Sequence, residues 1–301
     1  MKRLVLLGGG HAHVEVLRAF TERPLAGCEI VLVTPYPWLT YSGMVPGFVA
    51  GHYALEDCTI DLAALARRAG ATLRLSSVVA LDAAAREVTA LDHSRIAYDL
   101  LSIDVGSVPM THVASGVEEN AIVLRPLERV VKGWTDVLGR ARQGAIRSIT
   151  MVGSGAAGVE LAFAMHHRLA TELGERAPHV RLVGDSRLPV PEFRVGARRR
   201  LCAEIEHRRI ELHQGSGVVE VGEGFVRLQN GLQFATDAVF WAAGSAAHPW
   251  IAASGLATDR RGFLLTSDLL QSVTHAEVFG AGDCATEQAH PVPKAGVFAE
   301  G

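Results

Sequence analysis

Two glycine-rich turns in this chain have the residue types and the spacing that bind the phosphates of a dinucleotide. The more complete turn, GSGAAG at residues 153–158, is a G-x-G-x-x-G sequence between the apolar segments SITMV and VELAFAM. In such a turn the first glycine permits a sharp bend, the second lets the backbone approach a pyrophosphate, and the third lets helix and strand pack closely. The N–H groups that begin the following helix then face the phosphates. The turn predicts a nucleotide site formed by Gly153, Gly155, Ala156, Ala157 and Gly158.

The other turn, GGGHAH at residues 8–13, follows LVLL and departs from this pattern at its last position. His13 stands where close packing of helix and strand leaves no room for a side chain, so we expect either a displaced helix or a polar partner for the imidazole. His11 and His13 also form an H-x-H pair, but no further ligand lies at a suitable spacing, and we expect no metal. The residues predicted to contact the cofactor are Gly8, Gly9, Gly10, His11 and Ala12.

The strand after each turn ends without the carboxylate that usually holds the adenosine ribose. After the second turn, VRLV runs into Gly184, with Asp185 one position on and Arg187 nearby. Arg187 suits the 2′-phosphate of NADPH, whereas Asp185 suits the ribose of NADH, so both nucleotides stay open. After the first turn, IVLV ends in Thr34 and Pro35, where the threonine hydroxyl can make one hydrogen bond to the cofactor.

A third segment that could do chemistry is VFGAGDCA, residues 278–285. Gly282 and Asp283 are predicted to contact the cofactor, because an aspartate here can accept a hydrogen bond from a sugar-alcohol hydroxyl while nearby N–H groups face a phosphate. The alternative is that Asp283 only caps the start of a helix.

The two turns belong to a repeated plan. KRLVLLGGGHAHVEVLRAF and RSITMVGSGAAGVELAFAM each combine a short apolar strand, a glycine turn and a helix, and each is followed by another apolar strand. This is the βαβ plan of a nucleotide-binding half. Strand-like segments and hairpin turns follow each repeat and end in a buried strand that runs into Gly106 or Gly244, both predicted to contact a cofactor. We predict an α/β fold of two Rossmann-like, three-layer nucleotide-binding domains, each with a small antiparallel sheet.

The composition fits two ordinary domains and argues against some partners. The chain has 301 residues, of which 49% are hydrophobic, and its formal net charge is -3. Such a charge favours neither nucleic acid nor an anionic membrane. The apolar run after MKR is too short for a secretion signal, and no stretch approaches the ~18 apolar residues of a membrane span. The 4 cysteines lie far apart without a C-x-x-C pair, so we expect a cytoplasmic protein with reduced thiols.

These segments, in this order and over nearly the whole chain, resemble the two-dinucleotide-binding flavoproteins, the pyridine nucleotide-disulfide oxidoreductase family. The resemblance rests on Gly8–Gly10, Gly153–Gly158 followed by Glu160, DAVFWAAG ending at Gly244, and VFGAGDCA. It implies that the first turn binds the ADP part of FAD and that the second binds NADH or NADPH. It also implies an FAD domain made of residues 1–110 and 241–301, with the nicotinamide domain inserted at residues 111–240.

Two shorter segments, YSGMVPG from Tyr41 and PKAGVFAEG from Pro293, resemble type II NADH dehydrogenase-like proteins and the flavoprotein module fused to selenide, water dikinase in some bacteria. In such relatives these segments lie against the flavin ring, and the glutamate after the second turn lies near the nicotinamide. The resemblance implies catalytic roles for Glu160 and Lys294. The further cofactor contacts that we predict are Tyr41, Met44, Pro46, Val79, Lys294, Ala295 and Gly296.

Three features depart from the family pattern. The ATG that ends the first half appears as DVG, residues 104–106, and nothing in the sequence accounts for Asp104 beside the core of the flavin domain. The redox-active disulfide of the reductase branches is missing. Relatives also continue into a C-terminal interface domain that carries a quinone site and amphipathic membrane helices, and we expect this domain to be absent or truncated here.

We therefore expect an FAD-dependent NAD(P)H dehydrogenase-like oxidoreductase that passes electrons to a quinone or another small acceptor without a redox disulfide. The alternatives are a reductase of selenium or sulfur compounds and a flavin-binding sensor or assembly protein with little turnover. We expect a small-molecule acceptor as the partner, with no nucleic acid and no membrane span, and a homodimer stays open. Association with the inner face of the membrane is expected only if a further C-terminal region anchors the chain.

Overall fold

The computed structural model describes residues 1–292 and 294, and in it the chain forms two compact units. Unit 1 comprises Met1–Tyr41, Thr59–Val108 and the chain from Ser245 onward, and unit 2 comprises Ser42–Cys58 and Pro109–Gly244. The chain passes between the units at Val108–Pro109 and at Gly244–Ser245, and the sequence predicts domain boundaries at residues 110 and 240. Ser42–Cys58 differs, because this segment of the predicted FAD domain lies in unit 2.

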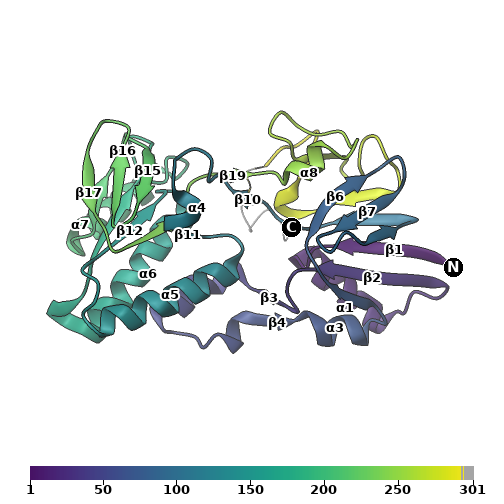
Figure 1. Cartoon of the computed structure of the whole chain (residues 1–301), viewed down its shortest axis with the longest axis horizontal. Helices are drawn as coiled ribbons and strands as arrows, with labels where there is room; N and C mark the ends of the chain where they lie inside the picture. Colours follow the sequence, from purple (N-terminus) through teal and green to yellow (C-terminus); the bar gives the residue numbers. More distant parts are fainter. Residues whose placement is uncertain (293, 295–301) are drawn as a thin grey trace. The chain divides into compact units, whose positions relative to one another are not determined.

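Unit 1 is built on a parallel sheet with the strand order β21-β9-β1-β2-β5. Figure 1 labels its strands β1 and β2. Alternate residues of a strand face opposite sides of a sheet. Leu6 of β1 packs with the helices α1 and α3, whereas Val5 and Leu7 pack on the other side with the antiparallel sheet β6-β7-β8. Because both faces are covered, the strand is continuously apolar from Leu4 to Leu7.

The bounds of the elements in this unit are β1 (Lys2–Leu7), α1 (His11–Glu22), β2 (Cys28–Thr34), β3 (Trp38–Thr40), β4 (Thr59–Asp61), α3 (Leu62–Arg68), β5 (Thr72–Leu75), β6 (Val78–Asp82), β7 (Glu87–Ala90), β8 (Arg95–Ala97), β9 (Leu100–Ile103), β19 (Ser245–Ala246), α8 (Pro249–Ala252), β20 (Leu264–Thr266), β21 (Val278–Gly280), the 3-10 helix η4 (Gly282–Cys284) and β22 (Ala285–Glu287). The strand β10 (Val108–Pro109) carries the chain into unit 2.

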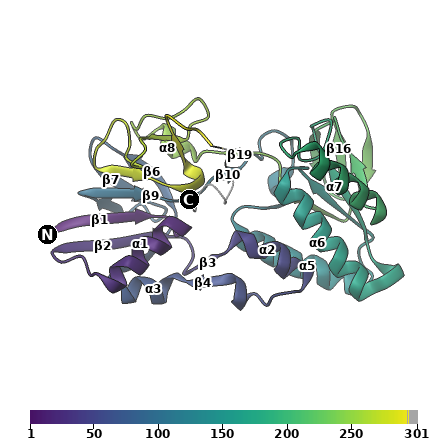
Figure 2. The ribbon, with the colours of Figure 1, turned by 180° about the vertical axis from the view of Figure 1, so that it is seen from behind.

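Unit 2 repeats this architecture on a parallel sheet with the order β11-β18-β12-β13-β14. Ile149 and Met151 of β12 pack with the helices α5 and α6, whereas Val152 packs on the other side with the antiparallel sheet β15-β16-β17. The short helix α2, the helical part of Ser42–Cys58, places Val45 and Val49 in the same apolar cluster as α5 and α6. Figure 2 shows these three helices together.

The bounds in this unit are η1 (Ser42–Met44), α2 (Val45–Ala50), η2 (Glu56–Cys58), α4 (Val117–Asn120), β11 (Ile122–Val123), α5 (Leu127–Arg142), β12 (Ser148–Val152), α6 (Ala156–Leu173), η3 (Gly174–Arg176), β13 (His179–Val183), α7 (Val195–His207), β14 (Glu211–His213), β15 (Val218–Gly222), β16 (Phe225–Leu228), β17 (Gln233–Ala235) and β18 (Ala238–Trp241).

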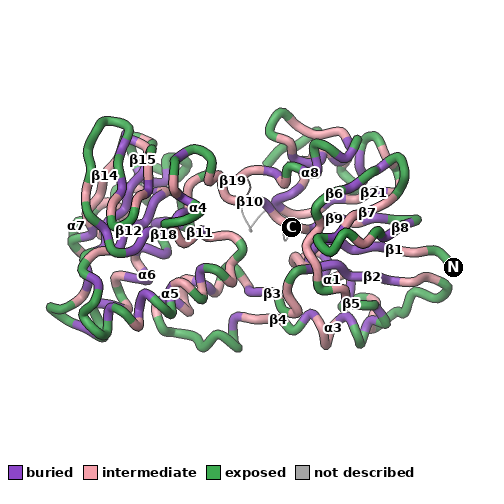
Figure 3. The backbone as a smooth tube through the Cα atoms, viewed as in Figure 1, coloured by how far each residue is buried: buried purple, intermediate pink, exposed green. Residues whose placement is uncertain are grey.

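The predicted fold class is confirmed. Each unit has three layers, with helices on one face of a parallel sheet and a small antiparallel sheet on the other. Figure 3 shows the buried strands at the centre of each unit and the exposed turns around them. Across residues 1–292 and 294, no helix is both long enough and apolar enough to cross a membrane.

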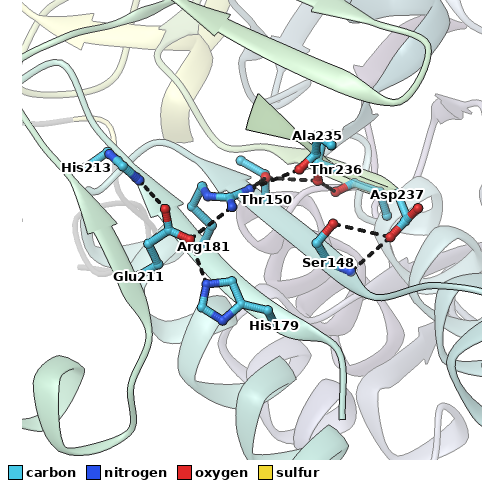
Figure 4. A network of polar contacts seen from close by, with 10 residues as sticks. Ser148, Thr150, His179, Arg181, Glu211, His213, Ala235, Thr236 and Asp237 are labelled. Carbon is cyan, nitrogen blue, oxygen red and sulfur yellow. Dashed lines mark hydrogen bonds and ion pairs between the residues drawn. The ribbon is translucent and has the colours of Figure 1, made fainter. Parts of the chain in front are cut away.

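A buried polar layer joins the two sheets of unit 2 (Figure 4). Arg181 lies on β13 and is buried, and its guanidinium group donates to the Thr150 hydroxyl and to the Ala235 carbonyl, each at 3.3 Å. The same guanidinium lies 4.1 Å from the centre of the Phe234 ring. Because Phe234 and Ala235 belong to β17, these contacts bind the antiparallel sheet to the parallel one.

Glu211 supplies the negative charge of this layer. Its carboxylate lies 2.9 Å from Arg181 and 2.7 Å from His179 Nε2, and it also contacts His213 (Figure 4). Burial alone would raise the pKa of Glu211, but the hydrogen bonds from Arg181, His213 and His179 lower it to about 2. The carboxyl group therefore stays ionised and compensates the buried guanidinium.

We predict that Glu211→Gln lowers the free energy of unfolding at pH 7 by about 1–2 kcal/mol, because it leaves Arg181 buried without a full counter-charge. The loss is smaller than for a fully buried pair, since 35% of the Glu211 side chain is exposed. The lowered pKa stabilises the wild type above the ordinary glutamate value of 4.5, and this stabilisation disappears as the pH falls toward 2. Urea unfolding at pH 7 and at low pH measures both effects.

The matched control is Glu204→Gln, which removes the partly exposed ion pair between Glu204 of α7 and Arg208, the residue that caps this helix. We expect this change to cost less than about 0.5 kcal/mol. Equal losses in the two variants would show that the polar layer contributes nothing beyond a surface pair.

Candidate functional site

In each unit the strand order reverses beside the first strand of the repeat. β1 lies between β2 and β9, and β12 lies between β13 and β18, with all of these pairs parallel. Doubly wound sheets bind ligands in the crevice outside the carboxyl ends of the strands at such a switch point. Gly8 follows β1 directly and Gly153 follows β12 directly, so each predicted turn lies at the switch point of its own sheet.

The second turn has a separate structural role for each glycine. Gly153 has φ +109°, and a Cβ there would lie 2.7 Å from the carbonyl carbon of Ala242. Gly155 is the N-cap of α6, and a Cβ at this position would have nothing within 4 Å, so the chain leaves this side open. A Cβ on Gly158 would overlap the carbonyl oxygen of Gly153. The geometry fits a sharp bend, an open approach for a pyrophosphate, and close packing of helix on strand.

The other residues predicted for this nucleotide lie around the same strand ends. Ala156 and Ala157 are exposed in the first turn of α6. Gly184 is buried beyond β13, where a side chain would meet Ser154 and the Gln214 amide nitrogen, the latter at 2.8 Å. Asp185 and Arg187 follow it and are exposed. Gly244, with φ +66°, follows β18 and is packed against Met110.

Glu160 lies on the surface of α6, just after the glycine turn. Desolvation by the surrounding chain raises the pKa of its carboxyl group above the ordinary value. A carboxyl group with a raised pKa beside a nucleotide turn is a candidate for proton exchange or for contact with the ligand.

The first turn has the same backbone plan and different side chains. Gly8 has φ +92°, and a Cβ there would lie 2.6 Å from the carbonyl carbon of Asp104, just as Gly153 lies against Ala242. A Cβ on Gly9 would overlap Leu62 and lie 3.3 Å from the Thr34 hydroxyl. Gly10 is the N-cap of α1, as Gly155 is of α6.

His13 is buried with 1% of its surface exposed, and it has the polar partners that the sequence predicts. Its Nδ1 lies 2.6 Å from the Gly8 carbonyl oxygen, and its Nε2 lies 2.8 Å from the Ser102 hydroxyl. Because a carbonyl only accepts, Nδ1 carries the proton, and Nε2 of the neutral ring accepts from Ser102. The pKa of His13 is lowered by burial, which favours this neutral form.

Asp104 is the functional candidate whose role sequence reasoning missed. It follows β9, and only 6% of its surface is exposed. One oxygen of its carboxyl group accepts from the Ala12 amide at 3.0 Å and from the His13 amide at 3.4 Å, which caps α1 from within the unit. The signal was available in the repeats, because Asp104 stands where the second repeat has Ala242 and His13 stands where it has Gly158.

The remaining predicted residues of unit 1 differ in their distance from this turn. Thr34 is buried beside Gly9, and Pro35 follows it and is exposed. Tyr41 makes an edge contact with His11, with ring centres 5.1 Å apart. Gly106, with φ +67°, lies two residues beyond Asp104. Val79 lies on β6 and is exposed.

Asp283 and Lys294 lie beyond the last strand of the unit 1 sheet. Gly282, with φ +66°, begins η4, and Asp283 is buried in it. The Lys294 ammonium group donates to the Ala285 carbonyl and to the Thr286 hydroxyl, the latter at 2.9 Å, and lies 4.5 Å from the centre of the Phe263 ring. Burial lowers the pKa of Lys294. Ala295 and Gly296 lie outside the described residues.

Met44 and Pro46 lie in unit 2, around the start of α2, and not in unit 1 with Tyr41. The Met44 carbonyl lies 3.9 Å from the Cys58 thiol, and Val45 and Val49 bind the helix to α5 and α6. In the part of the chain that the structure describes, no group of three or more His, Cys, Asp or Glu side chains could hold a metal ion.

The sequence profile of the pyridine nucleotide-disulphide oxidoreductases matches residues 2–297, so the chain belongs to this family. This match confirms the predicted family, which is a family of FAD-dependent oxidoreductases.

Three proteins similar to this chain share between 18% and 27% of its residues over the aligned regions. A probable NADH dehydrogenase of Dictyostelium discoideum is 27% identical over 207 residues, which are 62% of this chain and 46% of that protein. The chain thus spans about half the length of that relative. The water-forming NADH oxidase of Lactobacillus brevis superposes with a TM-score of 0.82 at 18% identity, over 100% of this chain and 67% of that one. The sulfide:quinone oxidoreductase of Aquifex aeolicus gives 0.78 at 20% identity, over 100% and 74%.

We predict that Gly155→Val folds normally but loses affinity for the pyridine nucleotide by more than tenfold, because the side chain fills only the space left open for the phosphates. The free energy of unfolding is expected to stay within about 1 kcal/mol of the wild-type value. Titration with NADH or NADPH and thermal unfolding measure the two properties.

Two other glycines serve as controls. Gly196→Val in α7 also has nothing within 4 Å and should leave both stability and binding close to wild type. Gly158→Val meets the Gly153 carbonyl oxygen and should lower the free energy of unfolding by more than about 2 kcal/mol. Unchanged nucleotide affinity in Gly155→Val would place the nucleotide away from this turn.

Proposed function

We propose that this protein is an FAD-dependent NAD(P)H dehydrogenase, which moves hydride from NADH or NADPH to FAD and passes the electrons to a quinone or another small acceptor. The observation that carries the proposal is the pair of glycine turns, each at the switch point of its own parallel sheet. A chain with two such turns suits two dinucleotides that react with each other. The family assignment supports the same pair of cofactors.

The first turn fits the FAD nucleotide and the second fits the pyridine nucleotide. In unit 1, Gly8–Gly10, Thr34 and Asp283 would hold FAD, in the predicted domain of residues 1–110 and 241–301. In unit 2, Gly153–Gly158 and Gly184 would hold NADH or NADPH, in the predicted domain of residues 111–240. FAD, when bound, supplies a reversible acceptor of two electrons, and the protein's residues bind and orient the reactants.

The state of the cysteines supports transfer to the acceptor without a dithiol relay. Cys28, Cys58, Cys202 and Cys284 are all free thiols. Cys284 follows Asp283 in η4 and is buried, and burial raises the pKa of its thiol to about 12. A thiol that is neutral at physiological pH is a poor nucleophile for disulfide exchange. A quinone is the favoured acceptor, because a similar structure is a sulfide:quinone oxidoreductase and a relative is a probable NADH dehydrogenase.

Two ionisable side chains have candidate roles at the reacting groups. Glu160 lies one turn into α6, and its raised pKa suits a carboxyl group that contacts the nicotinamide or exchanges a proton near it. Lys294 donates to the Ala285 carbonyl and to the Thr286 hydroxyl, and its ammonium form would place positive charge near the end of η4. We therefore propose both residues as candidates for the catalytic roles that the family resemblance implies.

The proposal predicts that the purified protein is yellow and that its flavin absorbance bleaches rapidly when NADH or NADPH is added without oxygen. Addition of quinones, dyes or selenium compounds to the reduced protein should restore the colour, and the fastest of them identifies the class of acceptor. Comparison of the two nucleotides determines which of them the protein prefers. Slow or absent bleaching of a yellow protein would favour a flavin-binding sensor, and a protein that cannot take up FAD would overturn both functions.

We further predict that Asp283→Ala loses FAD on dialysis, with an affinity at least tenfold lower, because a buried carboxyl group that accepts from the cofactor is removed. Asp268→Ala, an exposed carboxylate in the same unit, is the control and should retain FAD as the wild type does. The ratio of flavin absorbance to protein absorbance after dialysis measures retention. Equal retention in the two variants would remove Asp283 from the flavin site.

A further inference from the structure

Three positions differ together between the two repeats. Ser102, Asp104 and His13 of the first repeat occupy the places of Phe240, Ala242 and Gly158 in the second. The strand registers establish the first two matches, since Leu6 pairs with Ser102 as Met151 pairs with Phe240, and each turn glycine lies against residue 104 or 242. The small Ser102 leaves room for the imidazole, and the imidazole bonds to the Gly8 carbonyl.

The Asp104 carboxyl group lies at the first glycine turn, in the place where the proposed second nucleotide turn has no acidic side chain. It accepts hydrogen bonds from the amides of Ala12 and His13 in the first turn of α1. The corresponding residue beside α6 is Ala242, whose side chain offers no acceptor. A Cβ added to Gly10 would overlap the Asp104 carboxyl atoms. An anion held at this turn would therefore lie next to a carboxyl group.

The groups that face Asp104 favour its carboxylate form less than burial disfavours that form. From α1 they are His11 and His13, and His13 is held neutral by its two hydrogen bonds. From η4 the facing group is Cys284, whose own thiol is neutral. In the described part of the chain, Asp104 makes no ion pair with a lysine or an arginine.

The next charged groups are Asp283, which lies on η4 with Cys284, and Lys294. Lys294 interacts electrostatically with both Asp283 and Cys284. Burial by itself raises the pKa of Asp104. The two negative charges of a pyrophosphate would raise it further, because like charges in a site that excludes water cannot both ionise at low cost.

We propose that FAD binds to this protein with the side chain of Asp104 in its neutral acid form, so that binding takes up a proton from solvent onto this carboxyl group. Asp104 is then a positioning residue: as an acid it still accepts from the amides of α1, and it carries an O–H donor where a carboxylate carries only acceptors. His13 is the fixed neutral partner that holds the turn open. This inference rests on the proposed binding of FAD in unit 1.

The proposal predicts that the FAD dissociation constant of the wild type rises at least tenfold between pH 6 and pH 9. The dissociation constant should not change with pH below the pKa of Asp104 in the FAD-free protein. Above that pKa it should rise up to tenfold for each pH unit. Asp104→Asn, which stays uncharged and keeps an acceptor, should bind FAD with a constant that changes less than twofold over this range. Equilibrium dialysis of the holoprotein, with free FAD measured by fluorescence, gives these values.

Asp99→Asn is the matched control. Asp99 precedes the same strand, is exposed, and accepts from the Arg3 amide at 2.6 Å, so its removal also deletes a carboxylate–amide bond. This variant should keep the pH dependence of the wild type.

A second measurement needs no variant. FAD titrated calorimetrically into FAD-depleted wild-type protein at pH 8, in two buffers of different ionisation enthalpy, should show net proton uptake approaching one per FAD. A flat dissociation constant with no proton uptake, or a pH slope that persists in Asp104→Asn, would overturn the inference while leaving FAD binding intact. Weak binding in Asp104→Asn at every pH would also overturn it, because the carboxylate would then be the required form. Failure of the wild type to bind FAD at any pH would overturn the proposed function and the inference with it.

Discussion

The close approach of two backbone segments at each switch point is the constraint on which the rest of the structure depends. Gly8 lies against the backbone of Asp104, and Gly153 lies against the backbone of Ala242, at distances that exclude a Cβ atom. Each glycine also has a positive φ, which allows the chain to leave its strand and begin a helix at once. The start of the helix therefore lies over the carboxyl ends of the strands, and the flanking apolar clusters hold the sheet that positions it.

The backbone of both sites could be predicted from the sequence because it depends on local signals. An apolar strand, a glycine at a fixed place and a helix with an apolar face are all contiguous in the chain. Because this pattern occurs twice, each occurrence supports the prediction made from the other. The side-chain contacts at the first turn depend on residues far apart in sequence: His13 bonds to Ser102, and Asp104 caps a helix that begins at residue 11. No spacing rule indicates such contacts, although comparison of the two repeats marks the positions.

The placement of Ser42–Cys58 was beyond sequence reasoning for a different reason. Its neighbours in the chain, Tyr41 and Thr59, belong to unit 1, and the resemblance to flavoproteins assigned the whole stretch to one domain. Its location is decided by packing, since Val45 and Val49 complete an apolar cluster formed by α5, α6 and the unit 2 sheet. A six-residue helix with two buried valines has little periodicity by which to identify its partner in advance.

The buried polar groups of the two units show why a shared fold does not imply a shared site. In unit 2 the buried charge, Arg181, lies on β13 and is compensated by Glu211. The turn after β12 itself consists of glycine, serine and alanine. In unit 1 the buried ionisable groups lie at the turn itself. Replacing His13 alone would leave the Gly8 carbonyl and Ser102 without their partner, and replacing Ser102 by a residue as large as Phe240 would remove the space for the imidazole. His13, Ser102 and Asp104 therefore form one interdependent group. This group distinguishes the electrostatics of the first nucleotide turn from those of the second.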